Sequence, residues 1–172
     1  GKLYRRALLT EHHLHFDPAL PRMQDNLFNM EVFHAARELV YVDYAGYHYR
    51  MGGLGARTLA NTAKGLYHPA IDARARLMRD YRLDTDADLR QAWAAEQVNL
   101  YYQEIKAVAA LEPKDWNAIR NACWQRACML HPRLSAVDHR SLPKAGRLKY
   151  AMLTNRFMNT VAATLLWKNH GK

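Results

Sequence analysis

The hydrophobic positions between residues 24 and 37 follow a helical pattern. Apolar side chains recur there at steps of three and four residues, the spacing that places them on one side of an α-helix. The positions are Leu27, Phe28, Met30, Val32, Phe33 and Ala36. We therefore expect a helix that begins at Gln24 or Asp25 and ends near Arg37. The pattern of residues 4–12 predicts a shorter helix. The chain then leaves the helical conformation before Pro18, because a proline disfavours helical geometry in the residue before it.

Residues 39–50, LVYVDYAGYHYR, change to a pattern rich in Val and Tyr. The turn-compatible pair Ala45-Gly46 divides the stretch, so we expect two short β-strands, Leu39–Val42 and Tyr47–Arg50. Two short strands do not make a stable sheet alone. We expect them to complete a larger sheet whose other strands are not in this sequence. The glycines within residues 52–65 then predict a loop.

Beyond residue 67 the pattern predicts only helices. They span approximately residues 69–81, 86–111, 113–130 and 143–168. Pro69 and Pro113 suit first helical turns, and Asp84 or Asp86 can cap the second of these helices. The apolar side of the last helix carries Leu153, Phe157, Val161 and Leu165. The expected fold class is thus α/β, with a small α/β part followed by a mostly α-helical bundle.

Composition is that of a globular protein, with 49% hydrophobic and 24% charged residues in a chain of 172. No run approaches the roughly 18 to 20 apolar residues that span a bilayer, and the N-terminal residues do not resemble a secretion signal. Cys123 and Cys128 lie about 140° apart on a helix, so they share neither a face nor a metal ion. We expect two buried, reduced thiols, as in a cytoplasmic protein.

The positive charge is concentrated in the last third of the chain. Residues 1–116 contain 15 Lys or Arg and 15 Asp or Glu, whereas residues 117–172 contain 10 Lys or Arg and the single acid Asp138. A basic surface of this kind suits an anionic partner, such as phospholipid head groups, nucleic acid or a phosphorylated small molecule. We favour an anionic membrane surface over nucleic acid, because residues 148–167 are amphipathic. A bundle helix packed by its apolar side, with a solvated basic side and no special partner, explains the same pattern at least as well.

Several spaced elements in the first 50 residues resemble a known family. They are Lys2–Arg6, Phe16-Asp17, Gln24-Asp25, Phe28-Asn29, Val42-Asp43 and Tyr47–Arg50. In this order they resemble the second half of the catalytic domain of bacterial family 2 glycosyltransferases, which have the GT-A fold. The resemblance implies that residues 1–66 are the acceptor-side half of such a domain, with a partial Rossmann-like sheet, and that residues 67–172 are a helical C-terminal region.

The resemblance also implies a reaction. It would be transfer of a sugar from a nucleotide-sugar donor to a saccharide or lipid-linked acceptor, with inversion, in the synthesis of bacterial surface polysaccharide. Asp25 would be the general base, at a helix N-terminus that favours its negative charge. Gln24, Asn26, His48 and Arg50 would contact the substrates, although Gln24 replaces the Glu usual in the family. A role for Asp25 as a helix cap alone is the competing interpretation.

The donor-binding half of such an enzyme is not visible in the sequence. We expect the chain to be a fragment of a cytoplasmic enzyme, which could lie peripherally on the inner face of the cell membrane. A divalent metal, Mg or Mn, is expected on the donor diphosphate of the complete enzyme, with its ligands outside this chain. The cluster Glu11–His15 lacks the spacing of a helical zinc site. The alternative function is a non-catalytic basic helical module that binds nucleic acid or another anionic partner.

Overall fold

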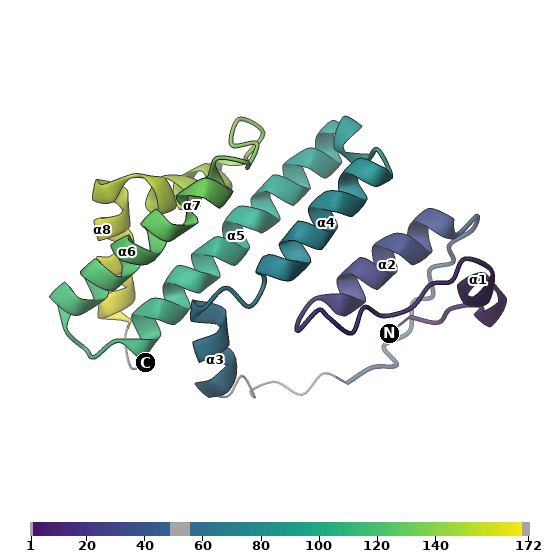
Figure 1. Cartoon of the computed structure of the whole chain (residues 1–172), viewed down its shortest axis with the longest axis horizontal. Helices are drawn as coiled ribbons and strands as arrows, with labels where there is room; N and C mark the ends of the chain where they lie inside the picture. The colour runs from purple at the N-terminus through teal and green to yellow at the C-terminus, as the bar shows by residue number, and fades with distance from the viewer. Residues whose placement is uncertain (1, 49–55, 170–172) are drawn as a thin grey trace. The chain divides into compact units, whose positions relative to one another are not determined.

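The computed structural model describes residues 2–48 and 56–169. Within these ranges the backbone forms α-helices, a single 3-10 turn and no β-strand (Figure 1). The elements are α1 (Arg6–Glu11), α2 (Gln24–Ala35), α3 (Ala56–Ala63), α4 (His68–Asp80), η1 (Leu83–Thr85), α5 (Ala87–Leu111), α6 (Trp116–Leu134), α7 (Lys144–Thr154) and α8 (Arg156–Lys168).

The elements form two compact units that alternate along the sequence. Unit 1 comprises residues 1–54 and 67–82 and contains α1, α2 and α4. Unit 2 comprises residues 55–66 and 83–172 and contains the remaining helices. The division of the chain into residues 1–66 and 67–172 stays a prediction, and the two units divide it differently, because residues 67–82 belong to unit 1 and residues 55–66 to unit 2.

Unit 1 is built on the packing of α2 against α4. Its small core consists of Leu20, Leu27, Ala70 and Ala73, with Met23 and Leu77 packed against it. Met23 has a left-handed backbone, with φ 62°, directly before α2 begins. This conformation is uncommon for a residue with a side chain. Packing of the Met23 side chain against the core therefore helps to fix where the helix starts.

Unit 2 is organised around α5, which contacts α3, α6, α7 and α8. The Asp86 carboxylate caps α5 by accepting hydrogen bonds from the backbone N–H groups of Asp88 and Leu89, each at 2.9 Å. Asp115 caps α6 in the same way through the N–H of Ala118, at 2.6 Å. These caps satisfy N–H groups that a helix leaves without an internal partner. The predicted helices over residues 69–81, 86–111 and 113–130 are confirmed with small shifts of their ends.

The expected α/β fold class, with its partial GT-A sheet, is wrong for the described residues. Residues 39–48 form no strand, and every one of them is exposed. Val40 and Tyr41 are 79% and 87% exposed. Val and Tyr favour strands because their side chains pack well on a pleated, half-buried sheet. Without neighbouring strands to pack against, these residues do not form a strand by themselves. Residues 49 and 50, the end of the second expected strand, lie outside the described residues.

The loop expected over residues 52–65 is also corrected. Residues 56–63 form α3. Three of the four glycines that suggested a loop precede this helix, and the fourth, Gly65, follows it with φ 89°. Helices commonly end with a glycine in the left-handed conformation, just after the last helical residues. The first part of the expected loop, residues 52–55, lies outside the described residues.

The single helix predicted over residues 143–168 is divided into α7 and α8. Asn155 interrupts it with an extended backbone, φ −109° and ψ 126°, and its side-chain Oδ1 accepts a hydrogen bond from the N–H of Met158 at 3.1 Å. Asparagine is a preferred N-cap, which explains why a new helix starts here. The predicted apolar side is split by this break. Leu153 is fully buried, whereas Phe157 is 74% exposed.

The two thiols differ in their surroundings. Cys123 is buried in unit 2, whereas Cys128 is exposed, so the expectation of two buried cysteines is confirmed for Cys123 only. Among the described helices, none combines the length and the apolar character required to cross a membrane.

Candidate functional site

The start of α2 holds Asp25 at the surface of unit 1. The helix begins at Gln24, so Asp25 is its second residue, and Met23 occupies the N-cap position. Asp25 is exposed, and its Oδ1 accepts a hydrogen bond from the N–H of Asn26 at 2.9 Å. The N-terminal N–H groups of a helix attract negative charge. Asp25 therefore presents an exposed carboxylate at the positive end of α2, and it does not serve as the N-cap.

Three of the elements that carry the family resemblance meet beside Asp25. The Tyr4 ring lies edge-on to the ring of Phe28, with centroids 5.2 Å apart, and the Phe16 ring stacks on Phe28 at 4.3 Å. The Tyr4 hydroxyl donates a hydrogen bond to Oδ1 of Asn29 at 2.7 Å. Burial raises the pKa of Tyr4, and the charge of Asp25 raises it further. The segments around residues 4, 16 and 28 thus form one local structure.

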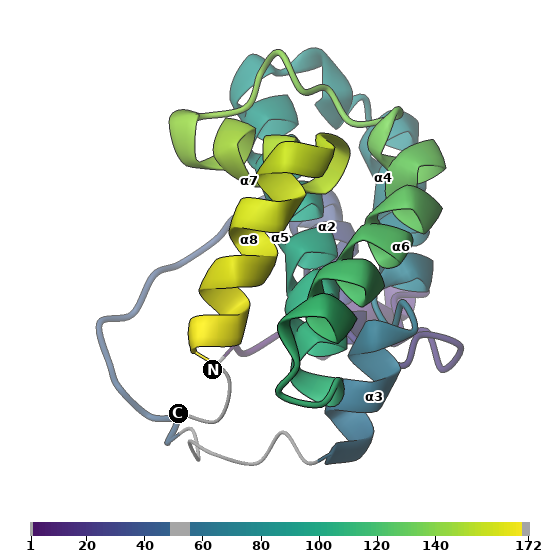
Figure 2. The same cartoon turned by 90° about the vertical axis from the view of Figure 1, so that its left-hand side faces the viewer.

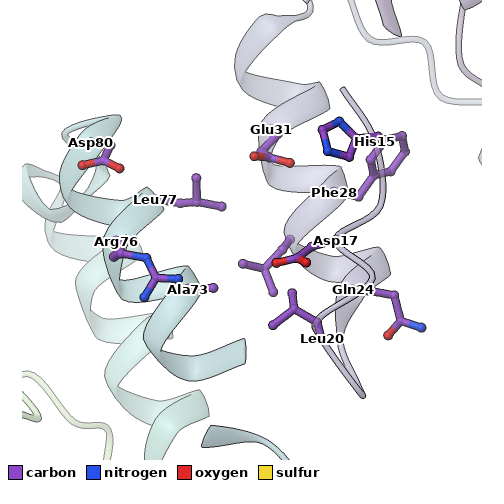
Figure 3. Close-up of a pocket in the computed structure, with 11 residues that line it drawn as sticks. His15, Asp17, Leu20, Gln24, Phe28, Glu31, Ala73, Arg76, Leu77 and Asp80 are labelled. Atoms are coloured by element: carbon purple, nitrogen blue, oxygen red, sulfur yellow. The ribbon is translucent and has the colours of Figure 1, made fainter. Parts of the chain in front are cut away.

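A cleft of about 220 Å³ lies between α2, α4 and the segment that precedes α2 (Figure 3). Its apolar lining consists of Leu20, Leu27, Phe28, Ala73 and Leu77. Its polar lining consists of His15, Asp17, Gln24, Glu31, Arg76 and Asp80. Glu31 and Leu77 extend into the space between the two helices. The cleft thus combines an apolar floor with polar groups that can form hydrogen bonds to a ligand.

The charges around the cleft are predominantly negative. Three carboxylates, on Asp17, Glu31 and Asp80, face a single guanidinium, on Arg76. Burial raises the pKa of Glu31; His15 lowers it, and the charge of Asp17 raises it. Like charges close together oppose ionisation, and they also repel an anionic ligand. The cleft therefore suits a neutral or cationic ligand with several hydroxyl groups better than a phosphate.

The structure places the predicted site residues in different surroundings. Gln24 lines the cleft, whereas Asp25, next to it in the first turn of α2, does not line it. The Oδ1 of Asn26 accepts a hydrogen bond from Nη1 of Arg74 at 3.1 Å, a contact that joins α2 to α4. His48 is exposed in the segment after α2 and does not line the cleft. Arg50 lies outside the described residues.

Glu31, Arg76 and Asp80 line the cleft but were not singled out from the sequence. Glu31 lies seven residues after Gln24, two helical turns further on, so the two side chains share a face of α2. That spacing could have identified Glu31. Arg76 and Asp80 are four residues apart on α4, and nothing local in the sequence indicates that this helix packs on α2.

The ligands of the expected Mg or Mn ion are predicted to lie outside this chain, and this stays a prediction. In residues 2–48 and 56–169, no group of three or more His, Cys, Asp or Glu side chains is arranged to hold one. In the cluster Glu11–His15, Nδ1 of His15 forms a hydrogen bond with the backbone oxygen of His13 at 2.8 Å.

The chain was compared with protein families, with curated proteins and with solved structures, and it showed no significant match in any of them.

Proposed function

We propose that this chain provides the acceptor side of an inverting sugar transferase, with Asp25 as the general base. The observation that carries the proposal is the exposed carboxylate of Asp25 in the first turn of α2, next to Gln24, which lines the cleft. The convergence of Tyr4, Phe16 and Phe28 supports it, because three separate elements of the family resemblance form one local structure. The GT-A sheet that the resemblance implied is not part of the proposal.

In the proposed reaction an acceptor hydroxyl gives its proton to a carboxylate oxygen of Asp25. The hydroxyl oxygen forms a bond to the anomeric carbon of the donor sugar from the side opposite the leaving group. The bond between that carbon and the nucleoside diphosphate breaks, and the diphosphate leaves with the electron pair. A single positioned carboxylate suffices as the base for such a displacement. Packing of Leu27 and Phe28 in unit 1 fixes the helix that carries it.

The neighbouring residues have distinct parts in the proposal. The Gln24 amide offers donors and an acceptor to sugar hydroxyls in the cleft. Asn26 contacts substrate through its amide nitrogen, because its oxygen is bonded to Arg74. His48 and Arg50 remain predicted substrate contacts. The charge of the cleft favours a saccharide acceptor without phosphate at the point of contact.

The proposal extends to the surroundings of the reaction. The donor is a nucleotide sugar, and the acceptor is a saccharide or a lipid-linked saccharide used for bacterial surface polysaccharide. A divalent metal, Mg²⁺ or Mn²⁺, would supply positive charge to the leaving diphosphate, and no described residue is assigned to it. The protein would work in the cytoplasm, peripherally at the inner face of the membrane.

The test compares Asp25→Asn with the wild type in protein expressed with its native flanking sequence. Release of nucleoside diphosphate is measured with UDP-, GDP- and dTDP-sugars and an extract of cell-envelope lipids and saccharides as acceptor. We expect Asp25→Asn to lower kcat by about 100-fold or more, the usual contribution of a general base. Donor binding, measured by calorimetry, should remain unchanged.

The matched control is Asp86→Asn, which changes the same residue type at the start of α5 in unit 2. Asparagine is also a good N-cap, so this variant should fold and turn over like the wild type. Retained turnover in Asp25→Asn would refute the assignment of the base. Equal loss in both variants would show that the effect is not specific to Asp25.

A second candidate is a non-catalytic basic module that binds an anionic partner. It is favoured by the all-helical structure of unit 2, in which α6, α7 and α8 together contain eight Lys or Arg residues and no Asp or Glu. This candidate predicts no sugar transfer with any donor in the panel. It also predicts salt-sensitive binding of the whole chain to an anionic polymer.

A further inference from the structure

One side of α8 exposes an apolar stripe formed by Phe157, Val161 and Leu165. These residues are four positions apart, so they lie on one side of the helix along about 12 Å of its axis. Phe157 is 74% exposed and Leu165 is 47% exposed, with Val161 partly buried between them. The stripe is therefore a ridge on the surface and not part of the core of unit 2.

The orientation of α8 is fixed by its opposite side. That side buries the small residues Ala162 and Ala163 and the amide of Asn159. Nδ2 of Asn159 donates a hydrogen bond to the backbone oxygen of Met152 in α7, at 2.9 Å. Rotating the stripe inward would break this buried hydrogen bond and leave polar groups without partners. The stripe consequently stays at the surface while α8 is packed against α6 and α7 (Figure 2).

One cation lies on the same side of α8 as the stripe. Lys168 follows Leu165 by three residues and is exposed. Arg156, which precedes Phe157, is exposed too, but its guanidinium lies over the Trp124 ring, 6.0 Å from the ring centroid. Lys168 lies eleven residues after Phe157, which places it about 20° from Phe157 around the helix. Of the helices that contact α8, α6 and α7 contain Lys and Arg but neither Asp nor Glu, whereas α5 contains Asp88, Glu96 and Glu104. Lys168 is thus the cation beside the stripe, and α6, α7 and α8 together carry a net positive charge.

We propose that the stripe Phe157, Val161 and Leu165 is a docking surface for an anionic lipid bilayer. Exposed Phe and Leu side chains beside Lys168, on helices with a net positive charge, match the boundary between acyl chains and anionic head groups. A second copy of the chain fits less well, because a symmetric contact would bring together two sets of helices that each carry a net positive charge. A nucleic acid backbone would pair with the cations but would leave the apolar ridge in water.

The test is sedimentation of the whole chain with vesicles of phosphatidylcholine alone or with about 30% phosphatidylglycerol. The tested variant is Phe157→Ser/Leu165→Ser. The control is Leu89→Ser, which is in the same unit and 43% exposed, but lies beside Asp86 and Asp88. Circular dichroism checks that each variant keeps its helix content.

We expect the wild type to bind the anionic vesicles and to release them as salt increases. The double serine variant should bind roughly tenfold or more weakly, because its apolar contacts with the acyl region are lost. Lys168→Glu should also weaken binding, and Leu89→Ser should bind like the wild type. Lys168→Glu tests the same surface without altering an apolar residue.

Equal binding to neutral vesicles would overturn the proposal, and so would unchanged binding of the double serine variant. It would also be overturned by a dimer that dissociates on introducing Phe157→Ser/Leu165→Ser, or by nucleic acid binding that needs these residues. The inference does not rest on sugar transfer. Vesicle binding through α8 and turnover through Asp25 are separate measurements, so either can fail while the other succeeds.

Discussion

The guanidinium of Arg126 on α6 pairs with the buried carboxylate of Glu104 on α5. Both Nε and Nη2 of Arg126 contact the same oxygen, Oε1. The side chain of Glu104 is only 1% exposed, and that of Arg126 is 15% exposed. Burial of a carboxylate without a partner is strongly unfavourable. The pair therefore joins the two helices in a way that depends on both residues being present.

Removing only the arginine should destabilise unit 2 markedly. We expect Arg126→Met to lower the free energy of unfolding by about 3 to 5 kcal/mol, because the buried Glu104 loses its ion pair with Arg126. The double variant Arg126→Met/Glu104→Leu should recover most of this loss, since no charge is left buried. Urea unfolding of the wild type, both single variants and the double variant gives the coupling energy. Additive effects of the two single changes would contradict the pairing.

The helices α5 and α6 could be predicted because their signals are local. Asp86 and Asp115 stand at helix starts and cap them through hydrogen bonds to backbone N–H groups a few residues away. Residues 39–48 show the opposite case. Their Val and Tyr content has meaning only beside other strands, and the described chain provides none. Likewise, the spacing of Leu153 and Phe157 predicted one continuous side, but the cap formed by Asn155 divides it.

The candidate site could be predicted only on its α2 side. The helix start that presents Asp25 follows from the periodicity after Met23, and Gln24 follows from the same start. The opposite wall of the cleft, with Arg76 and Asp80, depends on α4 packing against α2. That contact joins residues about 50 positions apart in the sequence, as in the hydrogen bond from Arg74 to Asn26. No local pattern specifies such a pairing.

The two cysteines should react at very different rates. Burial raises the pKa of the Cys123 thiol to about 12, and the charge of Glu112 also raises it. Since the thiolate is the reactive form, Cys123 should be inert at pH 8 in the folded protein, whereas the exposed Cys128 should react. Titration with a disulfide reagent should detect one thiol in native protein and two in denaturant. Reaction of a thiol in native Cys128→Ser at the wild-type rate would contradict this.

Glu31 should make the stability of unit 1 depend on pH. Burial raises the pKa of its carboxyl above the usual 4.5, with Asp17 adding to the effect and His15 opposing it. The folded state therefore binds more protons than the unfolded chain as pH rises from 4.5 through the raised value, so stability falls across that window. The destabilisation is complete above the raised pKa of Glu31, where its carboxyl is ionised in both the folded and the unfolded state.

The variant Glu31→Gln removes this charge from the cleft. It should be more stable than the wild type at pH 7 and equally stable below pH ~4, where the carboxyl is protonated in both states. Urea unfolding at several pH values measures the difference, and NMR of the carboxyl carbon reports the titration of Glu31 directly. Glu38→Gln is the control, because Glu38 is exposed just after α2. If Glu31→Gln raised stability by the same amount at every pH, ionisation of Glu31 would not be the cause of the gain.

The buried amide of Asn159 should hold α8 in its observed orientation. Asn159 is 1% exposed, and its Nδ2 donates a hydrogen bond to the backbone oxygen of Met152. Asn159→Ala should lower the free energy of unfolding by about 1 to 3 kcal/mol, because this oxygen loses its side-chain donor and a void replaces the amide. Asn121→Ala, an exposed change on α6, should be neutral or slightly stabilising, since alanine favours helix. Equal unfolding midpoints for the two variants would show that the hydrogen bond from Asn159 does not hold α8 in place.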